Sequence, residues 1–216
     1  MSAPLGVILA GGRATRMGGG DKGLLTLNNA TILTHVIERL APQVAGIALS
    51  ANGDPKRFAA FGLPVLPDPV AGYPGPLAGV LAGLDWAAGE GADRIITVAA
   101  DTPFFPSELA RRLMGAAEGM AHPLVLAATP HEAGERTRSM SRSGRVRHPT
   151  FGLWPVALRD DLRAALQEGL RKVVIWTEKH DGREAVFADA HAFFNVNTPE
   201  DLIEARRRAG TCGSMG

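Results

Sequence analysis

Three short apolar runs constrain the fold more than any other feature of this sequence. They span residues 5–10, 44–51 and 94–100, and they are rich in Val, Ile, Leu and Ala without strict alternation of apolar and polar residues. Strands that are covered on both faces have this pattern, so we expect central parallel strands. Residues 32–40 carry apolar side chains at helical spacing, and residues 77–88 form an apolar, Ala-rich stretch, so both predict helices. Alternating strands and helices indicate the α/β fold class.

The composition predicts one globular domain over residues 1–216. With 45% hydrophobic residues, the chain is long enough to bury roughly 70% of its unfolded surface. Its 23 Lys and Arg residues balance 22 Asp and Glu residues, and the formal net charge of +1 is too small for a protein that coats nucleic acid or an anionic membrane. No apolar run approaches the roughly 20 residues of a membrane-spanning helix. The single cysteine, Cys212, excludes an intrachain disulfide and a cysteine-built metal site, which favours a cytoplasmic setting.

A glycine-rich, basic segment directly follows the first apolar run. Residues 11–23 hold six glycines, and the three cations Arg13, Arg16 and Lys22 against the single anion Asp21 give a net charge of +2. Glycine lets the backbone approach a ligand and point its amides at it, while the cations offset the charge of a polyphosphate. Lys22 is not followed by Ser or Thr, and no G-x-G-x-x-G occurs here, so the Walker and dinucleotide fingerprints are not matched. We predict a phosphate-binding loop, and the alternative is a flexible turn with incidental charges.

Two aspartates stand where ligands are expected. Asp101 follows the third apolar run, so it should lie at the carboxyl end of a strand, which is the usual ligand side of an α/β sheet. Mg²⁺ takes one or two carboxylates together with substrate phosphate oxygens, which makes Asp101 a candidate magnesium ligand. Asp68 lies among five prolines between residues 64 and 76, in a loop stiff enough to hold a base or ribose at little ordering cost. For Asp101 the alternative is a turn-forming aspartate, and for Asp68 it is a surface proline turn.

A polar segment near the C-terminus gives a further candidate. If the segment is extended, Asn195 and Asn197 point to the same side, where two amides can ligate substrate or metal. The alternative is that Asn197 and Thr198 cap a helix that begins at Pro199 and runs to about Arg208.

Two segments are expected to carry no regular structure. Residues 130–147 lack periodicity and contain five arginines, which indicates a flexible basic insertion, and residues 209–216 are expected to form a disordered tail. His148 begins an apolar stretch that is typical of a strand returning to the sheet. A lone histidine is more often structural than a ligand. The six histidines show no metal-binding spacing such as H-E-x-x-H, which argues against a zinc hydrolase.

Several separated motifs together resemble one known family. They are Leu9-Ala10-Gly11-Gly12, Arg16-Met17-Gly18, Asp21-Lys22-Gly23, residues 73–79, Asp101-Thr102-Pro103 and residues 194–199. The first three resemble nucleotidyltransferases with a glycosyltransferase-A-like fold, and the whole set is similar to the molybdenum cofactor guanylyltransferases. The resemblance implies a three-layer α/β/α architecture with a Rossmann-like, mostly parallel sheet. The implied activity transfers GMP from GTP to the terminal phosphate of molybdenum-bound molybdopterin, which forms the guanine dinucleotide cofactor and releases pyrophosphate.

The same resemblance assigns roles to individual residues. The expected catalytic residues are Lys22, Arg16 and Asp101, with Mg²⁺ held by Asp101. The expected GTP contacts are Leu9, Ala10, Gly11, Gly12, Lys22, Ser50, Asp68, Gly79 and Asp101. The expected molybdopterin contacts from the resemblance are Asn195 and Asn197. Arg147 and His148 are added as expected contacts because they lie at the end of the basic insertion. One departure is visible, because Ser50 stands where related enzymes carry Asn, and the shorter hydroxyl offers no amide donors. Asn52 is the alternative for that nucleotide contact.

The implied chemistry is an in-line attack of the pterin phosphate on the α-phosphorus of GTP, with Mg²⁺ and Lys22 stabilising the transition state and the leaving pyrophosphate. The phosphate loop and the Asp101 carboxylate should therefore face one triphosphate from two sides. Two alternatives stay open: a relative that uses CTP or a sugar-phosphate or phospholactate acceptor, and a non-catalytic adaptor that delivers the cofactor. Further expected partners are proteins that donate molybdopterin and molybdoenzymes that accept the product.

Overall fold

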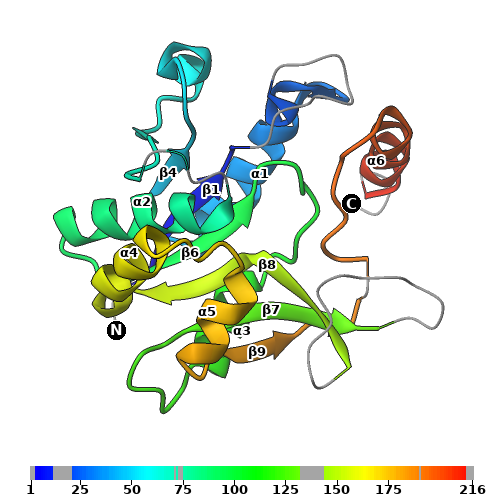
Figure 1. The fold of residues 1–216 in the computed structure, drawn as a ribbon. Helices are drawn as coiled ribbons and strands as arrows, with labels where there is room; N and C mark the ends of the chain where they lie inside the picture. The colour runs from blue at the N-terminus through cyan, green and yellow to red at the C-terminus, as the bar shows by residue number, and fades with distance from the viewer. Residues whose placement is uncertain are drawn as a thin grey trace.

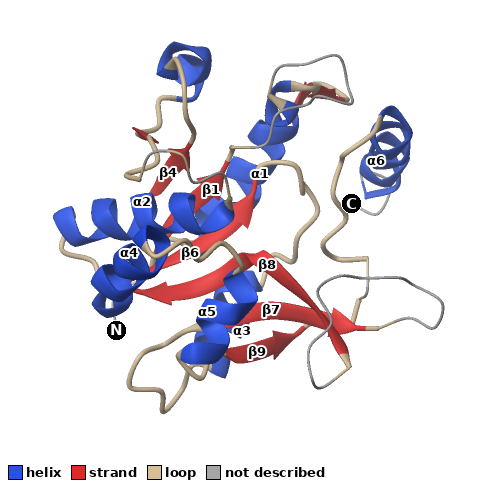
Figure 2. Ribbon diagram, viewed as in Figure 1, coloured by secondary structure: helices blue, strands red, loops and turns tan. Residues whose placement is uncertain are grey.

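The central element of the fold is a mostly parallel sheet. The computed structural model describes residues 3–11, 21–70, 72, 75–131, 144–189 and 191–212, and within these residues seven strands form one sheet in the order β5-β4-β1-β6-β8-β7-β9. Figure 2 draws the strands in red. They are β1 (Leu5–Leu9), β4 (Ile47–Ser50), β5 (Val65–Leu66), β6 (Arg94–Ala99), β7 (Val125–Pro130), β8 (Arg145–Pro155) and β9 (Arg183–Val186). Only β8 runs antiparallel to its neighbours, so the predicted fold class is confirmed.

Helices cover both faces of the sheet (Figure 1). They are α1 (Ile32–Leu40) and α3 (Leu109–Ala116) on one face, and α2 (Pro76–Gly89), α4 (Arg159–Gln167) and α5 (Val173–Lys179) on the other. Val7 and Ile8 of β1 are both fully buried, and they contribute to opposite cores because successive side chains of a strand alternate. This three-layer arrangement explains why the central strands are apolar without alternation.

The last helix, α6 (Pro199–Cys212), lies to one side of the sheet (Figure 1). It contacts the small ribbon formed by β2 (Thr26–Leu27) and β3 (Ala30–Thr31), and Arg206 donates a hydrogen bond of 3.3 Å to the Thr26 carbonyl. Ala205 anchors the helix in the core that also contains α1 and α3. In the described part of the chain, no helix is long and apolar enough to cross a membrane.

The structure differs from the sequence-based boundaries in three places. β4 begins at Ile47, three residues later than predicted, because the chain bends at residues 44 and 45 after the turn η3 (Ala41–Gln43). β8 begins at Arg145, where it pairs with the end of β7, so the last residues of the expected insertion belong to a strand. α6 continues to Cys212 and therefore includes the first four residues of the expected tail. Residues 132–143 and 213–216 lie outside the described residues.

Candidate active site

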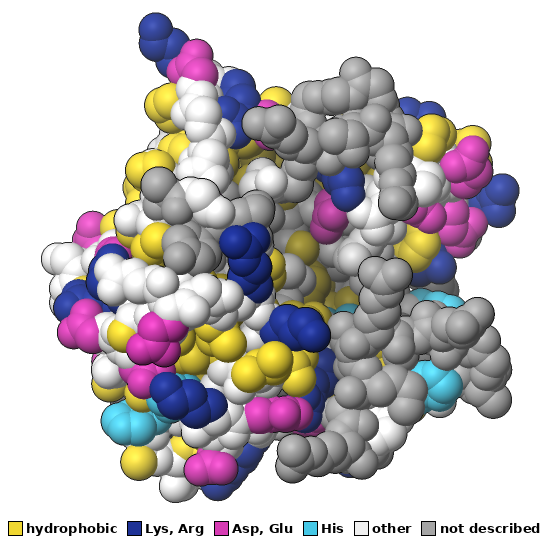
Figure 3. Space-filling view, viewed as in Figure 1, with side chains coloured by type: hydrophobic (Ala, Val, Ile, Leu, Met, Phe, Trp, Pro, Cys, Tyr) yellow, Lys and Arg dark blue, Asp and Glu magenta, His cyan; other side chains and the backbone are white. Residues whose placement is uncertain are grey.

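A cavity of about 960 Å³ opens at the carboxyl ends of β1, β4 and β6. These strand ends supply Leu9, Ala10, Gly11, Ser50, Ala51, Asn52, Ala99, Ala100 and Asp101, and the start of α2 supplies Gly75, Pro76 and Gly79. Figure 3 shows this face of the molecule hollowed near its centre. The carboxyl ends of parallel strands are the usual ligand side of such sheets, and the amides of a helix N-terminus favour anions.

Three side chains from distant parts of the sequence meet in one polar cluster at this cavity. Lys22 opens the short 3₁₀ turn η2 (Lys22–Leu24), Asp101 follows β6, and Asn197 precedes α6. The Lys22 Nζ lies 3.4 Å from Asp101 Oδ2 and donates a hydrogen bond of 2.5 Å to Asn197 Oδ1. The Lys22 and Asp101 side chains are only 19% and 22% exposed, which strengthens their interaction relative to a surface pair. The cation and the carboxylate that the sequence assigned to one triphosphate therefore face one cavity.

The segment before α6 is fastened to the end of β6. The Val196 amide donates a hydrogen bond of 2.8 Å to the Asp101 carbonyl, and the buried Thr102 hydroxyl donates to Asn195 Oδ1 at 2.5 Å. Thr198 caps α6, because its hydroxyl accepts a hydrogen bond from the Asp201 amide. Since Thr198 provides the cap, the Asn197 side chain can reach Lys22, and both asparagines end beside Asp101 or its neighbour.

The opposite wall of the cavity holds Asp68. Asn52 donates a hydrogen bond of 2.6 Å from Nδ2 to Asp68 Oδ2, and its Oδ1 accepts one of 2.9 Å from the Asp68 amide. Ser50 lines the same cavity but is 4% exposed and lies under α2. The sequence did not decide between Ser50 and Asn52 for the nucleotide contact. In the structure Asn52 is the one that contacts Asp68, the candidate nucleoside-binding residue.

Gly79 lines the cavity for a reason that the sequence did not indicate. A Cβ at this position would lie 2.5 Å from Ser50 Oγ and 2.8 Å from Leu9 Cδ2, so only glycine lets α2 pack this closely on β1 and β4. Gly11 is different, because a Cβ there would meet nothing within 4 Å and would point into open space. Gly79 therefore lets α2 form one wall of the cavity close to the sheet, whereas Gly11 leaves space free at the end of β1.

Apart from the two asparagines before α6, four predicted site residues are not among the described residues that line the cavity. Gly12 and Arg16 lie outside the described residues, so their roles stay predictions. His148 and Arg147, both in β8, are not among the described residues that line the cavity.

The side chains of His148 and Arg147 are engaged elsewhere. His148 Nε2 lies 3.0 Å from Thr129 Oγ1, its ring stacks on Phe193 at a centroid distance of 4.2 Å, and burial lowers its pKa to about 4. Arg147 is 11% exposed and forms ion pairs of 2.7 Å with Glu178 and with Glu184. These contacts join parts of the protein to one another. That either residue also binds the pterin stays a prediction.

Arg57 and Asp21 also line the cavity, and sequence reasoning gave neither of them a role at the site. Arg57 lies in the 3₁₀ turn η4 (Pro55–Phe61), and its Nε is 2.5 Å from Asp21 Oδ2. In the sequence, Asp21 counted as a charge in the glycine-rich loop and as part of the motif Asp21-Lys22-Gly23. The nearby sequence Asn52-Gly53-Asp54 indicates a turn, but nothing in it indicates that an arginine four residues beyond the glycine returns to the cavity.

The residues present are compatible with a bound divalent cation. Within the described residues no group of three His, Cys, Asp or Glu side chains could hold a metal, so a protein-only site is absent there. Asp101 nevertheless offers a carboxylate at the cavity, with its Oδ1 3.3 Å from the Thr102 hydroxyl and its Oδ2 near Lys22. One carboxylate combined with phosphate oxygens is sufficient protein ligation for Mg²⁺.

The fold is that of the nucleotidyltransferases. Molybdopterin-guanine dinucleotide biosynthesis protein A from Archaeoglobus fulgidus superimposes with a TM-score of 0.71 at 20% identity, over 96% of this chain and 99% of that one. CMP:2-keto-3-deoxy-manno-octonic acid synthetase, solved with CTP, gives the same TM-score at 15% identity, over 98% of this chain and 99% of its own. At these identities the likeness shows the fold and no more.

The sequence comparisons place the chain more narrowly. The MobA-like NTP transferase domain matches residues 6–182, and this chain belongs to that family. A molybdenum cofactor guanylyltransferase of Bradyrhizobium sp. is 49% identical over 94% of this chain and 92% of its own length. A protein of the same name from Cereibacter sphaeroides is 51% identical over 93% of this chain and 94% of its own.

Proposed function

We propose that this chain transfers GMP from GTP to the terminal phosphate of molybdenum-bound molybdopterin, forming the guanine dinucleotide cofactor and pyrophosphate. Two lines of support agree. Relatives about half identical over nearly their whole length carry the name molybdenum cofactor guanylyltransferase. The observation that carries the proposal for this chain is that Lys22 and Asp101 form one cluster in a cavity at the strand ends. We expect the reaction to take place in the cytoplasm.

Lys22 supplies positive charge where the triphosphate needs it. GTP carries about four negative charges, which repel the incoming pterin phosphate, and a partly buried ammonium reduces that repulsion. Asn197 and Asp101 hold the ammonium from two sides, so it is oriented before the substrate arrives. Asp101 would hold Mg²⁺, which in such sites polarises a phosphoryl oxygen and neutralises developing charge when bound.

The chemical step needs little proton transfer from the protein. A pterin phosphate oxygen forms a bond to the α-phosphorus of GTP, and the bond from that phosphorus to the bridging oxygen of the β-phosphate breaks in line. The electron pair of the broken bond leaves with pyrophosphate. A phosphate monoester has a second pKa of about 6 and is largely ionised at neutral pH, so no general base is required.

The nucleoside end of GTP fits the wall that carries Asp68. An ionised carboxylate is an acceptor-only group, and guanine and ribose present N–H and O–H donors. Asn52 holds this carboxylate in place through its side-chain amide, which reduces the ordering cost of binding. Asn195 and Asn197 are not among the described residues that line the cavity, but they accept hydrogen bonds from Thr102 and Lys22 next to Asp101. We expect the acceptor substrate to approach beside them.

Two assays test the function. Pyrophosphate release from GTP should require both Mg²⁺ and molybdenum-molybdopterin, and binding of both substrates without release would instead identify a delivery adaptor. Calorimetry in Mg²⁺ should show tighter binding of GTP than of CTP. Preference for CTP would assign the chain to a cytidylyltransferase activity on the same fold.

A further inference from the structure

A single guanidinium connects the two walls of the cavity. Arg57 forms an ion pair of 2.5 Å from Nε to Asp21 Oδ2, next to Lys22 on the phosphate side. Its Nη2 donates a hydrogen bond of 2.5 Å to the carbonyl of Asn52, whose side chain holds Asp68. One side chain therefore contacts both the end of the glycine-rich segment and the residue that orients the candidate nucleoside contact.

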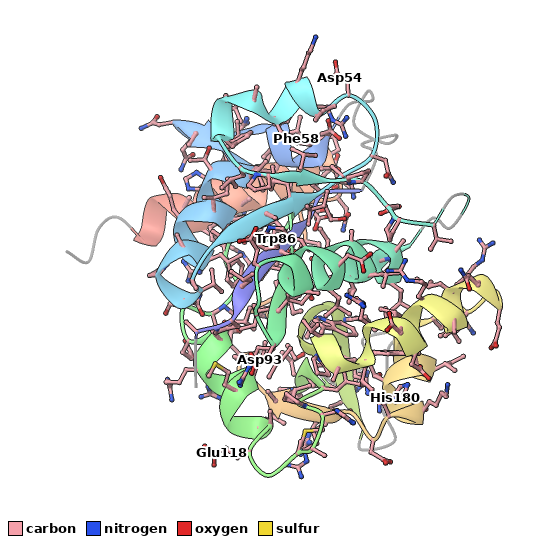
Figure 4. All side chains as sticks on the ribbon, turned by 90° about the vertical axis from the view of Figure 1, so that its left-hand side faces the viewer. Asp54, Phe58, Trp86, Asp93, Glu118 and His180 are labelled. Atoms are coloured by element: carbon pink, nitrogen blue, oxygen red, sulfur yellow. The ribbon has the colours of Figure 1, made fainter. Side chains whose placement is uncertain are left out.

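The guanidinium has little freedom to move. Its Nη1 donates a hydrogen bond of 2.9 Å to the Asp54 carbonyl, and its Cζ lies 4.6 Å from the ring centroid of the buried Phe58. Figure 4 labels Phe58, which lies in the turn η4, and Asp54, which directly precedes that turn. Gly53 has a φ of +86°, and a Cβ there would meet Arg57 Nη1 at 3.0 Å, so the glycine both allows the turn and leaves room for the guanidinium.

Asp21 behaves unusually for a residue at the start of a helical turn. It occupies the N-cap position of η2, where an aspartate normally accepts a hydrogen bond from a backbone amide of the first turn. Within the described residues its side chain makes no such cap bond and is instead paired with Arg57. Its geometry is therefore explained by the partner across the cavity and not by the local turn.

The pairing has an electrostatic consequence for a polyanion. Asp21 precedes Lys22 and lines the same cavity, and its side chain is 19% exposed. An unpaired carboxylate there would repel a triphosphate and offset part of the attraction of Lys22, since screening by water is reduced at a partly buried site. The Arg57 guanidinium offsets that charge through its ion pair with Asp21.

We infer that Arg57 is a positioning residue for nucleotide binding: it neutralises Asp21 beside Lys22 and fixes the Asn52 loop that orients Asp68. This inference rests on the proposed function, because it takes GTP as the ligand of the cavity. Arg57 acts through Asp21 and Asn52, so its effect on a ligand should depend on the ligand's phosphate charge.

The test compares GTP and GMP binding by calorimetry for the purified full-length protein and for Arg57→Met, Asp21→Asn and the double variant. Arg57→Met should weaken GTP binding roughly 10- to 100-fold, because it leaves a partly buried carboxylate unpaired beside the phosphates. GMP carries about two negative charges fewer than GTP, so its affinity should fall less. Adding Asp21→Asn to Arg57→Met should restore much of the GTP affinity. Asp21→Asn alone should bind GTP at least as tightly as the wild type.

Arg163→Met is the matched control. Arg163 forms a 2.6 Å ion pair with Asp85 between α4 and α2, with similar exposure, and it is not among the described residues that line the cavity. This variant should leave GTP affinity unchanged, and thermal unfolding of every variant reports any general loss of stability.

The inference is overturned if Arg57→Met binds GTP as the wild type does, or if it loses GTP and GMP affinity equally without recovery by Asp21→Asn. Weaker GTP binding by Asp21→Asn alone also overturns it, and that variant keeps the guanidinium in place should Arg57→Met fail to fold. Wild-type protein that binds GTP and releases pyrophosphate upholds the proposed function whatever the variants show. Wild-type protein that does neither overturns both.

Discussion

Replacing Lys22 by Met should nearly abolish turnover while leaving the chain folded. The Lys22 Nζ is 3.4 Å from Asp101 Oδ2, a separation at which two unit charges attract by about 5 kcal/mol in an effective dielectric of about 20. Loss of hydration on both ions reduces the net value in the ground state. In the transition state the same ammonium also faces the phosphate charges, and the loss of one such contact typically lowers kcat by about 10² to 10³. We therefore expect a decrease of that size for Lys22→Met.

The assay is pyrophosphate release at saturating GTP and Mg²⁺, followed as a function of molybdenum-molybdopterin concentration. Lys179→Met is the control, because Lys179 pairs with Asp161 at 3.1 Å on an exposed surface and should contribute little. If the two variants have equal thermal stability, a lower rate for Lys22→Met comes from lost catalysis and not from unfolding. A kcat for Lys22→Met within about fivefold of the wild type would refute the electrostatic role of this residue, because five-fold corresponds to only about 1 kcal/mol.

Three further predictions follow from packing and burial. Gly79→Ala should lower the free energy of unfolding by about 1–3 kcal/mol and weaken GTP binding, since its Cβ would lie 2.5 Å from Ser50 Oγ, and normal urea denaturation would contradict this. His148 has a pKa of about 4 against 6.5 when unfolded, so the unfolded chain binds more protons between these values. Stability should be full above pH 6.5 and decrease by about 3 kcal/mol on going down to pH 4, and His148→Gln should flatten that slope. Arg147→Met should lower Tm, because it removes a 2.7 Å ion pair from each of Glu178 and Glu184, whereas an unchanged Tm with a raised KM for the pterin would support the role expected from the sequence.

The apolar pattern predicted the parallel half of the sheet well. The structure places β1, α1, α2 and β6 within about one residue of the expected ranges, because each is buried on most of its surface and its composition records that burial directly. The half of the sheet that β8, β7 and β9 form leaves a weaker signal in the sequence. β9 has four residues, of which Ala185 alone is buried, and the first part of β8 pairs with β7 through backbone hydrogen bonds that arginine side chains do not disturb. Such pairing is decided by tertiary contacts, which a local pattern does not contain.

For the site, the position of a residue relative to a strand end was more informative than its immediate neighbours. Asp101 directly follows one apolar run, and Lys22 lies in the glycine-rich segment that follows another; the carboxyl ends of these neighbouring parallel strands meet at one edge of the sheet. The partners of these side chains were harder to predict. Gly79 was expected to contact the nucleotide, but it is also required for the close packing of α2 on the sheet, because a helix crossing depends on the facing strands.

The contacts of Arg57 at the site could not be predicted from the sequence. Its partners Asp21 and Asn52 belong to different loops that become neighbours only because β1 and β4 are adjacent in the sheet, and no spacing in the sequence records that adjacency. In the composition of the glycine-rich loop, Asp21 is one negative charge that lowers the net positive charge of the segment. The fold cancels that charge with a cation from the neighbouring strand's loop, so the phosphate side of the cavity is more positive than its own segment indicates. The electrostatics of this site are therefore a property of paired loops, and substitutions in the turn after β4 should change the affinity for phosphates that the turn itself does not contact.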